Sequence, residues 1–182
     1  MSDSIKLQST EYYTAAKNEL LKESKDANVF ALPKIDKISI NVGIGDFKND
    51  SKLRSDVEKY LFQLTGQKPK VVQSKVSVAG FKLRKGEPIG MVLTLRGKRM
   101  YDFLLNLVFL SLPRTRDFRG IPDSSFDKEY KSYSLGIRSS SVFPLIGFDT
   151  GINFGMQINL VFNQGREENK KLLQKLNFPF KK

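Results

Sequence analysis

The segment Ser77–Gly90, with Lys75 just before it, has the composition best suited to binding a polyanion. Together they hold four cations, three glycines and one proline, and Glu87 is the single acid. Glycine and proline disfavour both a helix and a packed strand, so this stretch is predicted to be a loop. Cations bind phosphates and an aromatic such as Phe81 packs on a ribose or base, which indicates RNA as a ligand. An ordinary solvated surface loop is the alternative interpretation.

A second group of polar side chains falls on predicted strands and turns. Asn41 shares the polar side of the strand 34–42 with Ser39, and Thr94 and Arg96 project from one face of the strand 91–96. Gln67 lies in the turn after a predicted helix. Amide, hydroxyl and guanidinium groups hydrogen-bond to ribose hydroxyls, base edges and phosphates. The alternative is structural: Asn41 closes its own turn, and Thr94 is a half-buried strand residue.

A third group is the basic cluster Arg114, Arg116 and Arg119, with Phe118 among them. It follows Leu112-Pro113, where the proline ends any helix. The segment 114–131 is polar and without a clear period, which predicts a long loop, and long loops are usually functional or disordered. A solvated turn remains the alternative for the arginine cluster.

Catalytic and metal chemistry find little support in this sequence. Cysteine and histidine are absent, which excludes disulfides, Cys or His metal sites, a thiol nucleophile and a histidine base. Gly43-Ile44-Gly45 falls short of a dinucleotide-binding loop because Lys48 stands where the third glycine is needed. Asp46, Asp50 and Asp56 lack metal-ligand spacing and are typical of helix starts. We therefore expect no enzyme, no cofactor and no metal.

The overall charge favours a nucleic acid as partner. In 182 residues the 31 Lys and Arg outnumber 19 acids, giving a net charge of +12. A basic protein that is merely soluble is the alternative. No signal-peptide pattern and no apolar run of membrane-spanning length is present, so we expect a soluble, cytoplasmic protein. No composition shift marks a linker, which predicts a single domain over residues 1–182.

The elements that position these residues follow from hydrophobic periodicity. The pattern predicts helices over about 9–22, from a cap at Asp50 or Ser51 to about 64, over 98–110 and over 165–176, and strands over 34–42, 70–73, 91–96, 133–138 and 156–162. This mixed order predicts an α+β fold, a mostly antiparallel sheet with helices on one face and long basic loops. The other sheet face is then free for a ligand, and the loop of about 73–90 is expected to be mobile.

Several segments, in one order over roughly residues 7–182, resemble the family of the bacterial-type large-ribosomal-subunit protein number five. The segments are LPKIDKISINVGIGDF (32–47), TGQKPKVVQSKVSVAGFK (65–82), SVAGFKLRKGEPIGMVLTLRGKRMYDFL (77–104), LPRTRDFRGI (112–121), YSLGIRSSSVFPLIGFD (133–149) and NFPFKK (177–182). The resemblance implies a curved antiparallel sheet with helices against its convex face. It also implies a structural ribosomal protein that holds 5S rRNA in the central protuberance and touches 23S rRNA and neighbouring central-protuberance proteins.

The resemblance also implies roles for particular residues. Those expected to bind 5S rRNA are Asn41, Gln67, Thr94 and Arg96. Those expected in the loop that faces the P-site tRNA are Lys75, Ser77, Phe81, Lys82, Arg84 and Lys85. Those expected in an intersubunit bridge to a protein of the small-subunit head are Arg114, Arg116, Phe118 and Arg119. A free-standing RNA-binding regulator or chaperone of similar fold is the alternative function.

Overall fold

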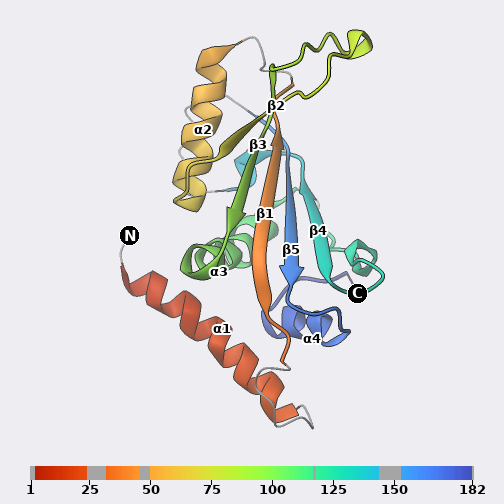
Figure 1. Ribbon diagram of the computed structural model, residues 1–182. Coiled ribbons are helices and arrows are strands. Elements are labelled where there is room, and N and C mark those ends of the chain that lie inside the picture. Colours follow the sequence, from red (N-terminus) through yellow and green to blue (C-terminus); the bar gives the residue numbers. More distant parts are fainter. Residues whose placement is uncertain (1–2, 24–31, 46–49, 117, 144–152, 182) are drawn as a thin grey trace. The chain divides into compact units, whose positions relative to one another are not determined.

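The computed structural model describes residues 3–23, 32–45, 50–116, 118–143 and 153–181. The main elements, shown in Figure 1, are α1 (Asp3–Glu23), β1 (Ile35–Gly43), α2 (Ser51–Thr65), β2 (Lys70–Gln73), β3 (Pro88–Leu95), α3 (Gly97–Leu105), β4 (Ser132–Ile137), β5 (Met156–Phe162) and α4 (Glu168–Lys175). The strands form one five-stranded sheet in the order β2-β3-β1-β5-β4. The sheet is antiparallel, which confirms the predicted α+β class.

The chain divides into two compact units, and the division falls within β1, β4 and β5. Unit 1 comprises residues 1–38, 96–135 and 159–182, and unit 2 comprises residues 39–95 and 136–158. The prediction that residues 1–182 act as a single domain stays a prediction.

In unit 2 the core forms where the apolar side of the strands meets α2. Burial alternates along β1 and β3: the side chains of Ile40 and Val42, and those of Met91, Leu93 and Leu95, are buried, while their sequence neighbours are half-buried or exposed. This period of two leaves one face of the strands outside the core.

Helix α2 begins and ends where its sequence predicts. The Asp50 carboxylate accepts hydrogen bonds from the backbone N–H groups of Lys52 (2.9 Å) and Leu53 (3.1 Å), which satisfies two donors at the helix start. Gly66 ends the helix in the left-handed conformation, with φ of 68°. The buried residues lie on one helical face and are Val57, Tyr60, Leu61, Leu64 and Thr65. Leu53, one turn before Val57 on the same side of the helix, is half-buried.

In unit 1 the helix α1 contacts both α3 and α4. The Ile35 backbone N–H donates to the Tyr13 hydroxyl oxygen (3.0 Å), and the Tyr13 and Tyr101 rings lie 4.5 Å apart. A second aromatic cluster joins the C-terminal residues to β4, and its members are Phe126, Tyr133, Phe178 and Phe180. Unit 1 is therefore held by aromatic packing between segments far apart in the sequence.

The predicted boundaries need four corrections. Helix α1 begins at Asp3 rather than near Ser9, and α4 covers only Glu168–Lys175. Strand β3 begins at Pro88 rather than Met91, because Pro88 pairs with Gln73 at the first strand position, where a missing N–H is tolerated.

The fourth correction concerns the predicted helix 98–110. It is an α-helix only to Leu105 and continues as a π-helix, η4 (Asn106–Ser111), and a 3₁₀ turn, η5 (Leu112–Arg114). The Ser111 hydroxyl donates to the Asn106 carbonyl (3.1 Å), five residues earlier, which matches the wider turn. Leu107, Val108 and Leu112 are buried in this segment.

Candidate nucleic-acid interface

The open face of the strands in unit 2 carries two of the predicted RNA-binding residues. Asn41 on β1 and Thr94 on β3 are half-buried and point away from the apolar core, because each alternates with buried neighbours. The strand residues of unit 2, namely 39–43, 70–73, 88–95, 136–137 and 156–158, include no acid. A phosphate backbone that approaches this face therefore meets no repelling carboxylate from the strands themselves.

Gln67 is fixed beside β3 by the end of α2. The Gln67 backbone N–H donates to the Thr65 hydroxyl oxygen (3.2 Å), and that hydroxyl donates to the Leu61 carbonyl (2.7 Å). The Gln67 side-chain Nε2 then donates to the Thr94 backbone carbonyl at 3.4 Å. The hydrogen bonds at the end of α2 thus bring Gln67 next to Thr94, although the sequence alone placed these two residues only on separate elements.

Arg96 follows directly on β3. It is exposed, and its backbone is extended (φ −140°, ψ 160°) at the position before α3 begins. It is two residues from Thr94 along the chain and belongs to unit 1. Arg96 therefore offers a solvent-facing guanidinium, the group best suited to donate two hydrogen bonds to a phosphate or to stack on a base.

A hollow on the open face was not foreseen from the sequence. It has a volume of about 400 Å³ and lies over β2, β3, β1 and β5. Its lining residues are Asn41, Val42, Gly43, Val72, Ile89, Gly90, Met91, Val92, Gly155, Met156 and Gln157. The one available sequence signal was the glycines inside strand patterns, which often mark sites where a ligand or another backbone comes close.

The basic segment between β2 and β3 is an internally bonded hairpin rather than an open loop. The Ser74 N–H donates to the Glu87 carbonyl (2.8 Å), the Gly86 N–H donates to the Ser74 carbonyl (2.9 Å), and Val78 and Leu83 form an antiparallel bridge. A 3₁₀ turn at Ala79–Phe81 closes its tip. Figure 1 shows this basic hairpin, residues 74–87, extending beyond the ends of β2 and β3. Its predicted mobility stays a prediction.

The basic hairpin brings together the residues predicted to face tRNA. Lys75, Lys82, Arg84 and Lys85 are all exposed, and Phe81 is 81% exposed at the tip. Ser77 has a structural contact as well, because its hydroxyl oxygen accepts from the Lys85 N–H (2.9 Å). A large aromatic so exposed beside cations makes no contribution to a core and is suited to contact a base or ribose.

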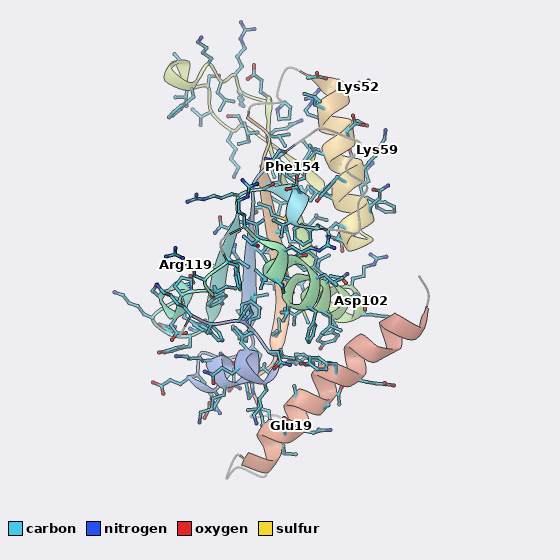
Figure 2. All side chains as sticks on the ribbon, turned by 180° about the vertical axis from the view of Figure 1, so that it is seen from behind. Glu19, Lys52, Lys59, Asp102, Arg119 and Phe154 are labelled. Carbon is cyan, nitrogen blue, oxygen red and sulfur yellow. The ribbon has the colours of Figure 1, made fainter. Side chains whose placement is uncertain are left out.

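The third predicted group, the arginine cluster with Phe118, lies in unit 1, on a loop that pairs with other segments of the unit. Arg114, Arg116 and Arg119 are exposed and Phe118 is half-buried; Figure 2 shows Arg119 pointing outward. The segment 114–131 contains a 3₁₀ turn (Asp123–Ser125) and bridges from Ile121 to Phe180 and from Phe126 to Tyr133. It is thus an irregular but tethered loop.

Neither a metal nor a membrane is suggested by the described residues. Within the described ranges, no three His, Cys, Asp or Glu side chains gather as metal ligands would. None of the helices in those ranges is both long and apolar enough to cross a membrane.

The comparisons with known proteins agree with each other. The family "Ribosomal protein L5" matches residues 28–84, and the family of the C-terminal part of ribosomal L5 proteins matches residues 88–180. The large ribosomal subunit protein uL5 of Dehalococcoides mccartyi (strain CBDB1) is 45% identical over 174 residues, covering 94% of this chain and 97% of the relative. The large ribosomal subunit protein uL5 of Mesoplasma florum is 46% identical over 175 residues, covering 95% of this chain and 97% of the relative.

These matches define a ribosomal protein of the large subunit. The chain belongs to the ribosomal protein L5 family. As a member it is a structural constituent of the large subunit that serves translation and has no enzymatic activity. Its partners are rRNA and other ribosomal components.

Proposed function

We propose that this protein binds 5S rRNA through the open sheet face and anchors it in the central protuberance of the large subunit. The observation that carries the proposal is the acid-free strand surface of unit 2, with Asn41 and Thr94 on its open side. Gln67 is hydrogen-bonded to Thr94 at the edge of that surface. Neutral hydrogen-bonding groups there suit ribose hydroxyls and base edges, and Arg96 supplies a contact to phosphate.

The other two groups have separate partners in this proposal. The basic hairpin contacts the P-site tRNA, with its four cations on phosphates and Phe81 against a ribose or base. The arginine cluster Arg114, Arg116 and Arg119, with Phe118, contacts a protein of the small-subunit head as part of an intersubunit bridge. Contacts with 23S rRNA and with neighbouring central-protuberance proteins complete the set. The exposure of all seven cations supports their availability to such partners.

Recovery of bound RNA tests the proposal against its alternative. The tagged protein is isolated from cell lysate after ribosomes have been dissociated, and the bound RNA is sequenced and quantified. One 5S rRNA per protein is the expected result. A diverse RNA pool with no enrichment of 5S rRNA would instead favour a free-standing RNA-binding regulator or chaperone.

A further inference from the structure

The hollow on the open face has an unusual chemical character for a basic protein. Its volume of about 400 Å³ falls within the range of small-ligand pockets, roughly 300–1,000 Å³. Among the described residues that line it, none is charged. It lies next to the base of the hairpin, because Val72 precedes the last residue of β2, and Ile89 and Gly90 follow the first residue of β3.

Three kinds of lining residue define what the hollow can hold. Two side-chain amides, from Asn41 and Gln157, supply both donors and acceptors. Val72 and Val92 supply aliphatic surface. Gly43 leaves open space at the end of β1, because an added Cβ would meet no atom within 4 Å; at Gly90 and Gly155 an added Cβ would instead lie 3.2 Å from the Val42 carbonyl oxygen and 3.4 Å from the Ile137 carbonyl oxygen. A phosphate would need a cation or a cluster of N–H donors, whereas a flat group with a polar edge needs an apolar surface and a few amides.

We propose that this hollow holds one unpaired nucleobase of the bound RNA. The inference rests on the RNA-binding function proposed above and assigns a specific contact within it. The amides of Asn41 and Gln157 hydrogen-bond to the polar edge of the base, and Val72 and Val92 contact its face. Gln157 and the glycine-lined space are thereby parts of the binding surface.

Charges around the hollow fit this arrangement. Lys70 is exposed on β2 and is paired in register with Val92, and the cations of the basic hairpin follow at the end of the same strand. Phosphates on either side of the bound nucleotide therefore meet positive charge while its base enters a neutral site. Recognition of a splayed-out base beside a phosphate-binding rim is a common mode for single-stranded RNA.

Gly43 offers a direct way to fill the hollow. A Cβ added at Gly43 would have no atom within 4 Å, and its φ is outside the left-handed region. Gly43→Val therefore adds a branched side chain to the hollow from a position where its Cβ meets no neighbour, and valine suits a strand. Gly80→Val is the matched control, because Gly80 also has no atom within 4 Å of an added Cβ but lies at the tip of the basic hairpin, outside the hollow and outside the proposed 5S rRNA surface.

Affinity for purified 5S rRNA is the measurement. Gly43→Val should weaken binding about tenfold or more, the loss typical of an excluded base contact, and Gly80→Val should bind like the parent. Parent-like binding by a folded Gly43→Val, or equal losses in both variants, would overturn the base site. If Gly43→Val fails to fold, as judged by circular dichroism, Gln157→Leu replaces it. A tenfold weaker affinity of Gln157→Leu supports the site, and an unchanged affinity overturns it.

A scan of abasic nucleotides in 5S rRNA identifies the base. For one unpaired nucleotide, removing the base should weaken binding to the parent about tenfold but should not further weaken binding to Gly43→Val. Strictly additive losses at every position would refute the inference. Failure of the parent itself to bind 5S rRNA would overturn the proposed function, which keeps the two failures distinguishable.

Discussion

The side chain of Gln67 donates a hydrogen bond to the backbone carbonyl of Thr94, with an Nε2···O distance of 3.4 Å. The two residues are 27 positions apart in the chain. This contact ties the turn after α2 to β3 and places two of the residues proposed to bind 5S rRNA side by side. A functional surface built this way depends on the helix end as much as on the strand.

Substitution of Gln67 should separate the structural from the RNA-binding contribution. Gln67→Ala should lower the free energy of unfolding by about 0.5–1 kcal/mol, because the lost hydrogen bond is long and only part-buried. Gln67→Glu removes the donor and adds a negative charge beside the RNA, so it should weaken 5S rRNA binding more than Gln67→Ala does. Urea unfolding and filter binding measure the two effects. Tighter binding by the glutamate variant than by the alanine variant would contradict this assignment.

The other three residues of the proposed 5S rRNA surface should differ in their contributions. Arg96→Ala should cost the most, about 1.5–3 kcal/mol of binding free energy, because it removes a charge-assisted contact. Thr94→Ala and Asn41→Ala should each cost about 1 kcal/mol. Lys52→Ala is the control, since it removes an exposed cation from the first turn of α2 (Figure 2). Parent-like affinity of all three site variants, each shown to be folded, would mean that the surface is wrongly assigned.

Binding to 5S rRNA should weaken steeply as salt is added. A protein of net charge +12 that contacts several phosphates displaces counterions from RNA. The logarithm of the affinity should fall with the logarithm of salt concentration with a slope of roughly −0.7 to −0.9 for each phosphate contact. Titrations between about 50 and 200 mM salt give the slope. A nearly flat dependence would indicate that the positive charge serves another partner.

Alanine at Lys75, Lys82, Arg84 and Lys85 should separate the basic hairpin from the sheet surface. These side chains are exposed, and the backbone hydrogen bonds of the hairpin do not involve them. The fourfold variant should therefore keep most of its affinity for isolated 5S rRNA but retain P-site tRNA less well on reconstituted ribosomes. The two assays are run on the same preparation. Equal losses in both would show that the hairpin is part of the 5S rRNA surface.

Alkaline pH should destabilise unit 2 through Tyr60. The Tyr60 hydroxyl donates to the Ser140 carbonyl, and burial raises the pKa of Tyr60 from its ordinary value of 10 to about 12. Because the fold favours the neutral phenol, its stabilising effect is complete below about pH 10 and is lost as the pH rises through about 12. Tyr60→Phe should cost about 1 kcal/mol at neutral pH, from the lost hydrogen bond.

The Tyr60→Phe variant should also have a smaller loss of unfolding free energy than the parent between pH 10 and 12. Phenylalanine retains the edge-on contact with Phe154, whose ring centre lies 5.1 Å from that of Tyr60. Burial also raises the pKa values of Tyr13 and Tyr133, and these groups titrate in both proteins, so the difference isolates Tyr60. Identical pH profiles for the two proteins would rule out the assigned role.

Much of the fold follows from local patterns in the sequence. The Asp50 cap, the apolar face of α2 and the alternation along β1 and β5 involve residues within a few positions of one another. Their periodicity alone therefore predicts the elements and the face that each one buries. The outward direction of the candidate residues Asn41 and Thr94 could be predicted from the sequence in the same way, because a polar residue between buried neighbours must point away from the core.

Contacts between segments that are far apart in the sequence could be identified only from the tertiary structure. The pairing of Pro88 with Gln73 moved the start of β3, and backbone hydrogen bonds pair the two sides of the basic hairpin, a segment whose composition indicated only a loop. The Gln67–Thr94 contact and the hollow over four strands arise from strand order and register. Periodicity carries no information on which strands become neighbours, since that choice is made by packing free energy summed over the whole core.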